Sequence, residues 1–191
     1  MSPRTDKQNK EIRERVELTI IESALELFAA DSYDGASMQS IAKKAKVSKG
    51  NLYNYFESKQ DLLEGVLVYG LNQIAEIFDS DAAELTTEEE FEFAIMQNFV
   101  IIKSNKIFWK LYYNLFAQPK VQLLFAKIFA PFLDKYIMIF ESYYTKKGYS
   151  NPKATAMLLG SALDGVSLGY LMMGEEYPLD EVVDQLIKKF K

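Results

Sequence analysis

The sequence has 191 residues, no cysteine, no histidine and a formal net charge of −5 at pH 7. Without cysteine there are no disulfides or thiolate sites, and without histidine the commonest metal ligand and neutral-pH acid–base group are missing. We therefore expect no cofactor and no enzymatic activity, although an enzyme that uses carboxylates is not excluded. Apolar residues (49%) and charged residues (26%) stand in a proportion typical of soluble globular proteins. With a polar N-terminus and no long apolar run, the chain is expected to be cytoplasmic, without a signal peptide or membrane span.

The charge is unevenly distributed along the chain. Residues 1–60 carry 10 Lys and Arg against 9 Asp and Glu, a net charge of +1, whereas residues 61–191 carry 12 against 18, a net charge of −6. The first sixty residues therefore differ from the rest in the partners that they can attract.

A first helix is predicted over residues 11–30, after a polar segment 1–10 that we expect to be flexible. Its apolar stripe follows helical spacing: Ile21, Ala24, Leu25 and Phe28. Residues 31–36 are predicted to turn into the next element.

Two short helices joined by a tight turn are predicted over residues 37–59. Ser37 caps the first, and Ser48 caps the second after a break at residues 46–47. Leu52 and Phe56, four residues apart, give the second helix one apolar face that must dock on the first.

The opposite face of this second helix carries small, basic or hydrogen-bonding side chains, as a helix that enters the major groove of DNA requires. Lysines at positions 43, 44, 46, 49 and 59 surround it and provide local positive charge. The candidate DNA-binding residues are Gln39, Ser48, Lys49, Gly50, Asn51, Tyr53, Asn54, Tyr55 and Lys59. A structural helix pair without DNA contacts is the alternative. Arg4, Lys7 and Lys10 could also follow the DNA backbone, although a disordered tail is the preferred interpretation.

Residues 13–67 closely resemble the DNA-binding domain of the tetracycline-repressor (TetR) family. The resemblance rests on an ordered set of residues: Tyr33, Gly35, Ser37-Met38, Ile41-Ala42, Val47-Ser48-Lys49-Gly50, Leu52-Tyr53, Phe56, Ser58-Lys59 and Leu62-Leu63. The sequence departs from the family at two positions. Ser32 stands where the family usually has glycine, so the chain must turn there without glycine or with serine in an unfavourable conformation. Tyr55 stands where histidine is frequent.

Six further helices are predicted, which gives an all-α fold of about nine helices. A long fourth helix follows Ser58 with an apolar stripe that includes Ile74 and Phe78, and it spans roughly 30 Å. Residues 79–87 break the pattern, and Thr87 with Glu90 forms a capping box. The remaining helices are predicted over residues 87–103, 107–117, 119–147 and 152–173, with a ninth that begins at Pro178.

The sixth and seventh helices contain more aromatic residues than one core stripe requires. Most of these residues are expected in the core, but a cavity lined by aromatic rings and a few polar groups is typical of small-molecule sites. Resemblance to the family implies an effector pocket in these helices. The candidate residues are Trp109, Tyr112, Tyr113, Phe116, Phe132, Tyr136 and Phe140.

The eighth and ninth helices offer two apolar stripes that, by resemblance to the family, meet a symmetry copy in a four-helix dimer interface. The candidate interface residues are Gly165, Leu168, Gly169, Val183, Leu186 and Phe190. Asp164 is expected either to hydrogen-bond across the dimer or to line the pocket, and the interface is favoured.

Together these patterns predict an all-α protein with a three-helix, helix-turn-helix DNA-binding domain at residues 1–57. A long helix joins it to a larger ligand-binding and dimerisation domain at residues 58–191. The predicted function is that of a homodimeric transcriptional regulator, a repressor that a hydrophobic or aromatic small molecule releases from a palindromic DNA operator. A helical enzyme that holds a small substrate in the aromatic pocket is the alternative, and a membrane-surface protein is disfavoured because charges are scattered over the chain.

Overall fold

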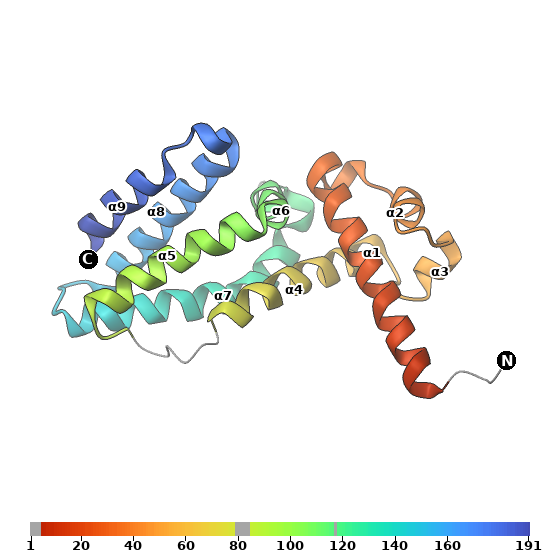
Figure 1. Cartoon of the computed structure of the whole chain (residues 1–191), viewed down its shortest axis with the longest axis horizontal. Helices are drawn as coiled ribbons and strands as arrows, with labels where there is room; N and C mark the ends of the chain where they lie inside the picture. The colour runs from red at the N-terminus through yellow and green to blue at the C-terminus, as the bar shows by residue number, and fades with distance from the viewer. Residues whose placement is uncertain (1–4, 79–84, 117) are drawn as a thin grey trace.

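The computed structural model describes residues 5–78, 85–116 and 118–191, and none of these residues lies in a β-strand. The predicted all-α fold is thus confirmed, with helices in the predicted order (Figure 1). Their bounds are α1 Asp6–Gly35, α2 Met38–Lys44, α3 Lys49–Tyr53, α4 Lys59–Phe78, α5 Glu88–Ser104, α6 Lys106–Phe116, α7 Pro119–Lys146, α8 Pro152–Met173 and α9 Leu179–Phe190, with a short 3₁₀ turn at Gly174–Glu176.

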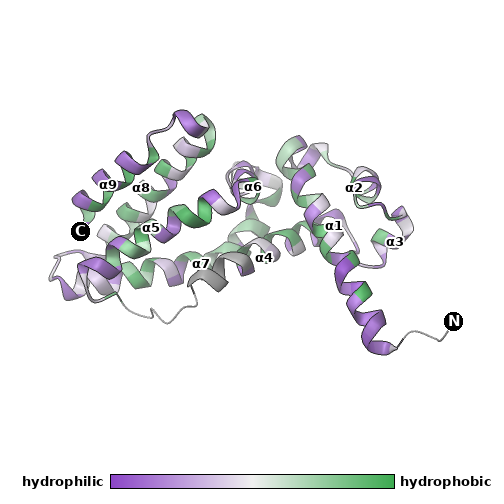
Figure 2. Ribbon diagram, in the orientation of Figure 1, coloured by the Kyte–Doolittle hydropathy of each residue, from purple (hydrophilic) through white to green (hydrophobic). Residues whose placement is uncertain are grey.

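Helix α1 is longer than predicted at both ends. Thr5 and Gln8 form a capping box, in which the Thr5 hydroxyl accepts from the Gln8 N–H at 3.3 Å. Because this cap satisfies the free backbone donors, residues 6–10 are helical, and the expectation of a flexible segment is wrong for them. Arg4 lies outside the described residues. Figure 2 shows that the first turns of α1 are hydrophilic.

Near its other end, α1 is broken at Ser32, whose backbone has φ 63° and ψ 167°. Residues with a side chain rarely occupy this region, which glycine enters freely. The expected unfavourable serine conformation is therefore confirmed. The helix resumes for three residues after the break, so most of the predicted 31–36 turn is helical in the structure.

Helices α1, α2 and α3 form a compact head, in which α2 packs on both neighbours. Phe28, Ile41, Leu52 and Leu63 are fully buried at its centre. The turn between α2 and α3 places Lys46 at φ 56°, and the Val47 N–H donates to the Ala42 carbonyl at 3.0 Å. This left-handed ending of α2 sets the angle at which α3 leaves.

Helix α4 leads from the head into the body, defined as α5 to α9 (Figure 1). The side chains of Ile74 and Phe78, which the sequence analysis placed on its stripe, lie outside the described residues. Head and body also meet directly, because α1 packs against α6.

The body is a bundle in which α8 packs on α7 and α9 packs on α8 and α5. Thr87 and Glu90 form the predicted capping box at the start of α5. Glu88, in the same turn, accepts from Lys147 and forms an ion pair with Lys191, and these contacts tie the ends of α5, α7 and the chain together. Their hydrogen bonds lower the pKa of the Glu88 carboxyl below its usual value.

Candidate functional site

Helix α3 presents its polar side outward because its apolar side is committed to the core. Leu52 is 0% exposed and Phe56, just beyond the helix, is 6% exposed. On the opposite side, Lys49 and Asn54 are exposed, and the large ring of Tyr53 is 45% exposed. A docked helix with an exposed basic and amide-bearing face is suited to read base edges and contact phosphates.

The other predicted DNA-binding residues lie on or beside this face. Ser48 caps α3, with its hydroxyl accepting from the Asn51 N–H at 3.0 Å, and no atom lies within 4 Å of a β-carbon placed on Gly50. Gln39 is exposed on α2, and Asn51 is half-buried. The contact of Asn54 Nδ2 with Asn51 Oδ1 is long, at 3.5 Å, so both amides are available to a base edge.

Two of the surrounding lysines are held by the protein itself. Lys59 donates to the Ala36 carbonyl at 2.7 Å, and its ammonium lies 4.4 Å from the centre of the Tyr33 ring. Lys44 forms an ion pair with Glu26 at 2.6 Å. The ammonium of Lys59 therefore fixes the turn between α1 and α2, and its phosphate contact stays a prediction.

Tyr55 is half-buried, and the guanidinium of Arg13 on α1 lies 5.4 Å from the centre of its ring. This contact joins α1 to the segment after α3, and it holds the tyrosine in place where the sequence departs from the family.

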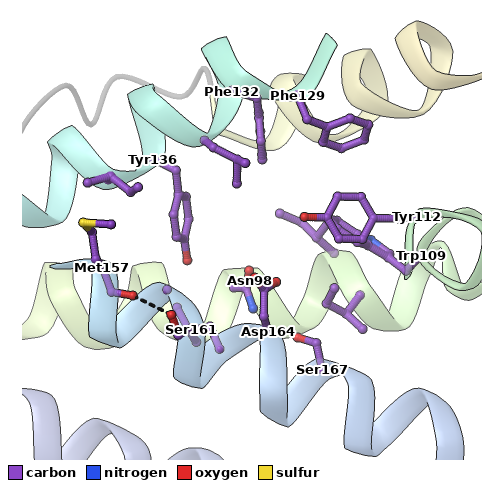
Figure 3. Close-up of a pocket in the computed structure, with 16 residues that line it drawn as sticks. Asn98, Trp109, Tyr112, Phe129, Phe132, Tyr136, Met157, Ser161, Asp164 and Ser167 are labelled. Atoms are coloured by element: carbon purple, nitrogen blue, oxygen red, sulfur yellow. Dashed lines mark hydrogen bonds between the residues drawn. The ribbon is translucent and has the colours of Figure 1, made fainter. Parts of the chain in front are cut away.

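The body contains a cavity of about 200 Å³ between α5, α6, α7 and α8. Its walls are mostly apolar and include aromatic rings from α6 and α7, which Figure 3 shows opposite Asn98, Ser161, Asp164 and Ser167. The lining residues are Asn98, Ile101, Ile102, Trp109, Tyr112, Phe129, Phe132, Leu133, Tyr136, Ile137, Met157, Gly160, Ser161, Leu163, Asp164 and Ser167. A largely apolar wall with few polar groups suits a small organic molecule.

Four of the seven predicted pocket residues lie in this wall: Trp109, Tyr112, Phe132 and Tyr136. Tyr113 is beside it and donates to Asp164, whereas Phe140 lies away from it and packs edge-on against Phe91 at 5.6 Å. The side chain of Phe116 lies outside the described residues.

The sequence analysis missed the contributions of α5 and α8 to this wall. Asn98 from α5 carried no distinguishing pattern, whereas Asp164 was expected either at the dimer interface or in the pocket, with the interface favoured. The structure instead places Asp164 in the cavity wall, where its Oδ1 accepts from the Tyr113 hydroxyl at 3.1 Å. A lone acid in an apolar helix was the signal that could have found it.

The charge of Asp164 influences the tyrosines around it. Burial raises the pKa of Tyr112, Tyr113 and Tyr136 far above the usual value, and the nearby carboxylate of Asp164 raises it further. Desolvation also raises the pKa of Asp164 itself, against the hydrogen bond from Tyr113, which lowers it. All three tyrosines therefore remain neutral hydrogen-bonding groups at physiological pH.

The structure distributes the predicted interface residues over two environments. Gly165 and Leu168 are exposed on α8, whereas Val183 and Leu186 are only 8% and 7% exposed because α9 packs them against its own protomer. The assignment of these two residues to an outer interface is therefore corrected. The ring of Tyr177 fills the space beside Gly169, where a β-carbon would stand 2.7 Å from Cε2. Phe190 is half-buried, and its carbonyl accepts from the Tyr144 hydroxyl at 2.9 Å.

Helix α8 keeps an apolar outer face in addition to the one that packs on α7. Leu158, Leu168 and Met172 on it are between 40% and 78% exposed. Among the described residues, one segment, Pro152–Glu176, is long and apolar enough to cross a membrane by length and composition alone, a property that core helices of soluble proteins share.

The head is similar to known protein sequences. Residues 20–66 match the sequence model described as "Bacterial regulatory proteins, tetR family". This match lies within α1 to α4, so the head of this chain is similar to the tetR-family regulators. The chain is similar to the uncharacterized HTH-type transcriptional regulator YuxN of Bacillus subtilis (strain 168), with 53% identity over 53 residues, 28% of this chain and 18% of that protein. It is also similar to the fatty acid metabolism regulator protein of the same organism, with 30% identity over 86 residues, 44% of each chain. The matches thus span less than half of the length of these curated relatives.

A likeness to solved structures extends over the body as well. The structure of the transcriptional regulator FadR from Bacillus subtilis in complex with stearoyl-CoA superimposes with a TM-score of 0.73, covering 91% of this chain and 96% of that one. Sequence identity over this region is 20%, so the likeness concerns the fold alone.

Proposed function

We propose that this protein is a ligand-responsive, DNA-binding transcriptional regulator that acts as a homodimeric repressor. The exposed polar face of α3 carries the proposal, because Leu52 anchors the helix while Lys49, Tyr53 and Asn54 remain accessible to DNA. Its tetR-family head and the regulators among its relatives support the same function. The relatives give no support to the enzyme alternative.

Dimerisation is proposed through the outer face of α8. Two heads related by a two-fold axis would read half-sites about one helical turn apart, roughly 34 Å. The exposed apolar stripe with Leu168 and Met172 supports this contact, since so large an apolar face on one helix is typical of an interface. Leu168→Glu combined with Met172→Glu should give monomers in sedimentation velocity, whereas a persistent dimer would place the interface elsewhere.

The cavity is proposed to hold the effector, a hydrophobic or aromatic small molecule. Trp109 is the only tryptophan in the sequence and lies in the cavity wall, so its emission should report occupancy. An effector that weakens DNA binding by some factor must itself bind the DNA complex more weakly by the same factor.

The function can be tested without a known operator. DNA sequences are selected from a random library with the purified dimer, and their affinities are then measured by fluorescence anisotropy. Selection of an inverted repeat that binds in a salt-dependent manner is the expected result. Enrichment of no sequence, together with equal affinity for all duplexes, would contradict specific regulation.

A further inference from the structure

The cavity carries a single negative charge and no positive one among the described residues that line it. Asp164 is the one acidic side chain in the wall, and no lysine, arginine or histidine is there. The single hydrogen bond to its carboxylate within the described chain comes from the neutral hydroxyl of Tyr113. Because this donor brings no charge, the carboxylate of Asp164 is not neutralised by the protein.

Aromatic rings stand opposite this carboxylate. Figure 3 shows Tyr112, Phe132 and Tyr136 across the cavity from Asp164. The faces of such rings attract cations, and a desolvated site strengthens the attraction. The acid and the rings therefore favour the same kind of ligand, and both disfavour an anion.

Two buried donors in the wall have no partner among the described atoms, Trp109 Nε1 and Asn98 Nδ2. Trp109 is 7% exposed, so its N–H is shielded from water and requires an acceptor within the cavity. Neutral donors of this kind also suit a carboxylate, but a second carboxylate beside Asp164 would meet like-charge repulsion in a desolvated space. An uncharged acceptor atom on the ligand satisfies these donors without that repulsion.

From this arrangement we propose that the cavity selects a lipophilic cation, an organic ammonium whose positive group pairs with Asp164 and whose apolar body lies among the rings. A neutral acceptor on the natural ligand would complete the site at Trp109 and Asn98. This inference rests on the proposed function only for the consequence of binding, because the binding itself is a property of the cavity.

The experiment compares three probes that differ in charge: (4-phenylbutyl)trimethylammonium, its neutral carbon isostere (5,5-dimethylhexyl)benzene, and 5-phenylpentanoate. Binding to the full-length protein is followed by Trp109 emission and by calorimetry. The cation should bind at least about tenfold more tightly than the isostere, and the anion more weakly than either. Equal affinities for cation and isostere would overturn the proposal.

Asp164→Asn is the decisive variant, since it removes the charge and keeps the size and an acceptor for Tyr113. Because the carboxamide keeps an acceptor for the Tyr113 hydroxyl, this variant should fold as the wild type does at neutral pH. It should lose most of the preference for the cation while binding the isostere as before. Glu175 is an exposed acid in the 3₁₀ turn, away from the cavity. Glu175→Gln removes the same charge there and should change neither the preference for the cation nor the affinity for the isostere.

The two proposals fail separately. If the cation binds in an Asp164-dependent manner but never alters DNA affinity, the cavity assignment stands and the regulatory function fails. If Asp164→Asn leaves the cation affinity unchanged, the charge assignment is wrong, whatever the protein does with DNA.

Discussion

The ring of Phe108 on α6 lies directly against Gly70 on α4, so closely that a β-carbon at Gly70 would stand 1.9 Å from its Cε2 atom. Phe108 is fully buried and contacts Trp109 edge-on, with ring centroids 5.7 Å apart. The ring of Phe108 therefore connects α4, the helix that leads to the head, with Trp109 in the wall of the cavity.

This contact predicts that Gly70→Ala is destabilising, although alanine is the better helix former. The buried ring of Phe108 has little room to move, so overpacking should cost about 1–3 kcal/mol. Gly165→Ala is the matched control, because nothing lies within 4 Å of its β-carbon and the helix propensity gain of up to about 1 kcal/mol should appear. Urea unfolding of both variants at equal protein concentration measures the difference, and equal stabilisation would show that the ring is free to shift.

Ser32→Gly should stabilise the protein. Serine at φ 63° and ψ 167° is strained by about 1–3 kcal/mol, and glycine removes most of that strain at some entropic cost in the unfolded chain. Asp31→Gly, one residue earlier and helical, should instead destabilise by about 1 kcal/mol. Thermal and urea unfolding of the two variants decide the matter, and the assigned backbone conformation is refuted if both changes destabilise.

Alanine substitutions at Lys59 and Lys49 should have different effects: the first should lower stability, and the second should weaken DNA binding with little effect on stability. Lys59→Ala removes the bond to the Ala36 carbonyl and the contact with Tyr33, so a stability loss of about 1–2 kcal/mol is expected. Lys49→Ala, at an exposed position, should change stability by no more than about 0.5 kcal/mol. It should weaken DNA binding and reduce the salt dependence by about one phosphate contact. Unchanged stability in Lys59→Ala would mean that its contact is absent in solution.

The affinity for the cationic probe should depend on pH in the acid range. The cation binds the ionised form of Asp164, whose pKa is raised above the usual 3.8 mainly by desolvation. Affinity should thus be constant above this pKa and fall below it toward the affinity of Asp164→Asn, starting at a higher pH than for an ordinary aspartate. Tyr112, Tyr113 and Tyr136 stay neutral throughout, because burial raises their pKa. Calorimetric titrations between pH 4 and 8 should show no such slope in Asp164→Asn.

Local patterns in the sequence were sufficient for most of the fold. Ser37, Ser48 and Thr87 cap the helices that their hydroxyls predicted, and the sequence also carries a glycine, Gly148 at φ 77°, just after α7. Each of these signals acts within one turn of the chain, so the amino-acid order alone carries it.

Local patterns could not predict the environment of a side chain that contacts residues far away in the sequence. Phe140 belongs to the same aromatic series as Tyr136, and only the packing of Phe91 from α5 separates the core residue from the cavity residue. Val183 and Leu186 form an apolar stripe that suits a partner protomer or the chain's own core equally well. Asp164 was misplaced for the same reason, since its partner Tyr113 is 51 residues away in the sequence.

The packing of α1 against α6 limits how the DNA-binding head of this protein can be exchanged for another. Synthetic sensors are made by exchanging the reading head of one regulator for that of another. A cut at residue 57 would separate α1 from the α6 surface on which it rests. A working chimera should therefore transplant the outer side of α6 together with the head, or redesign it to fit the incoming first helix.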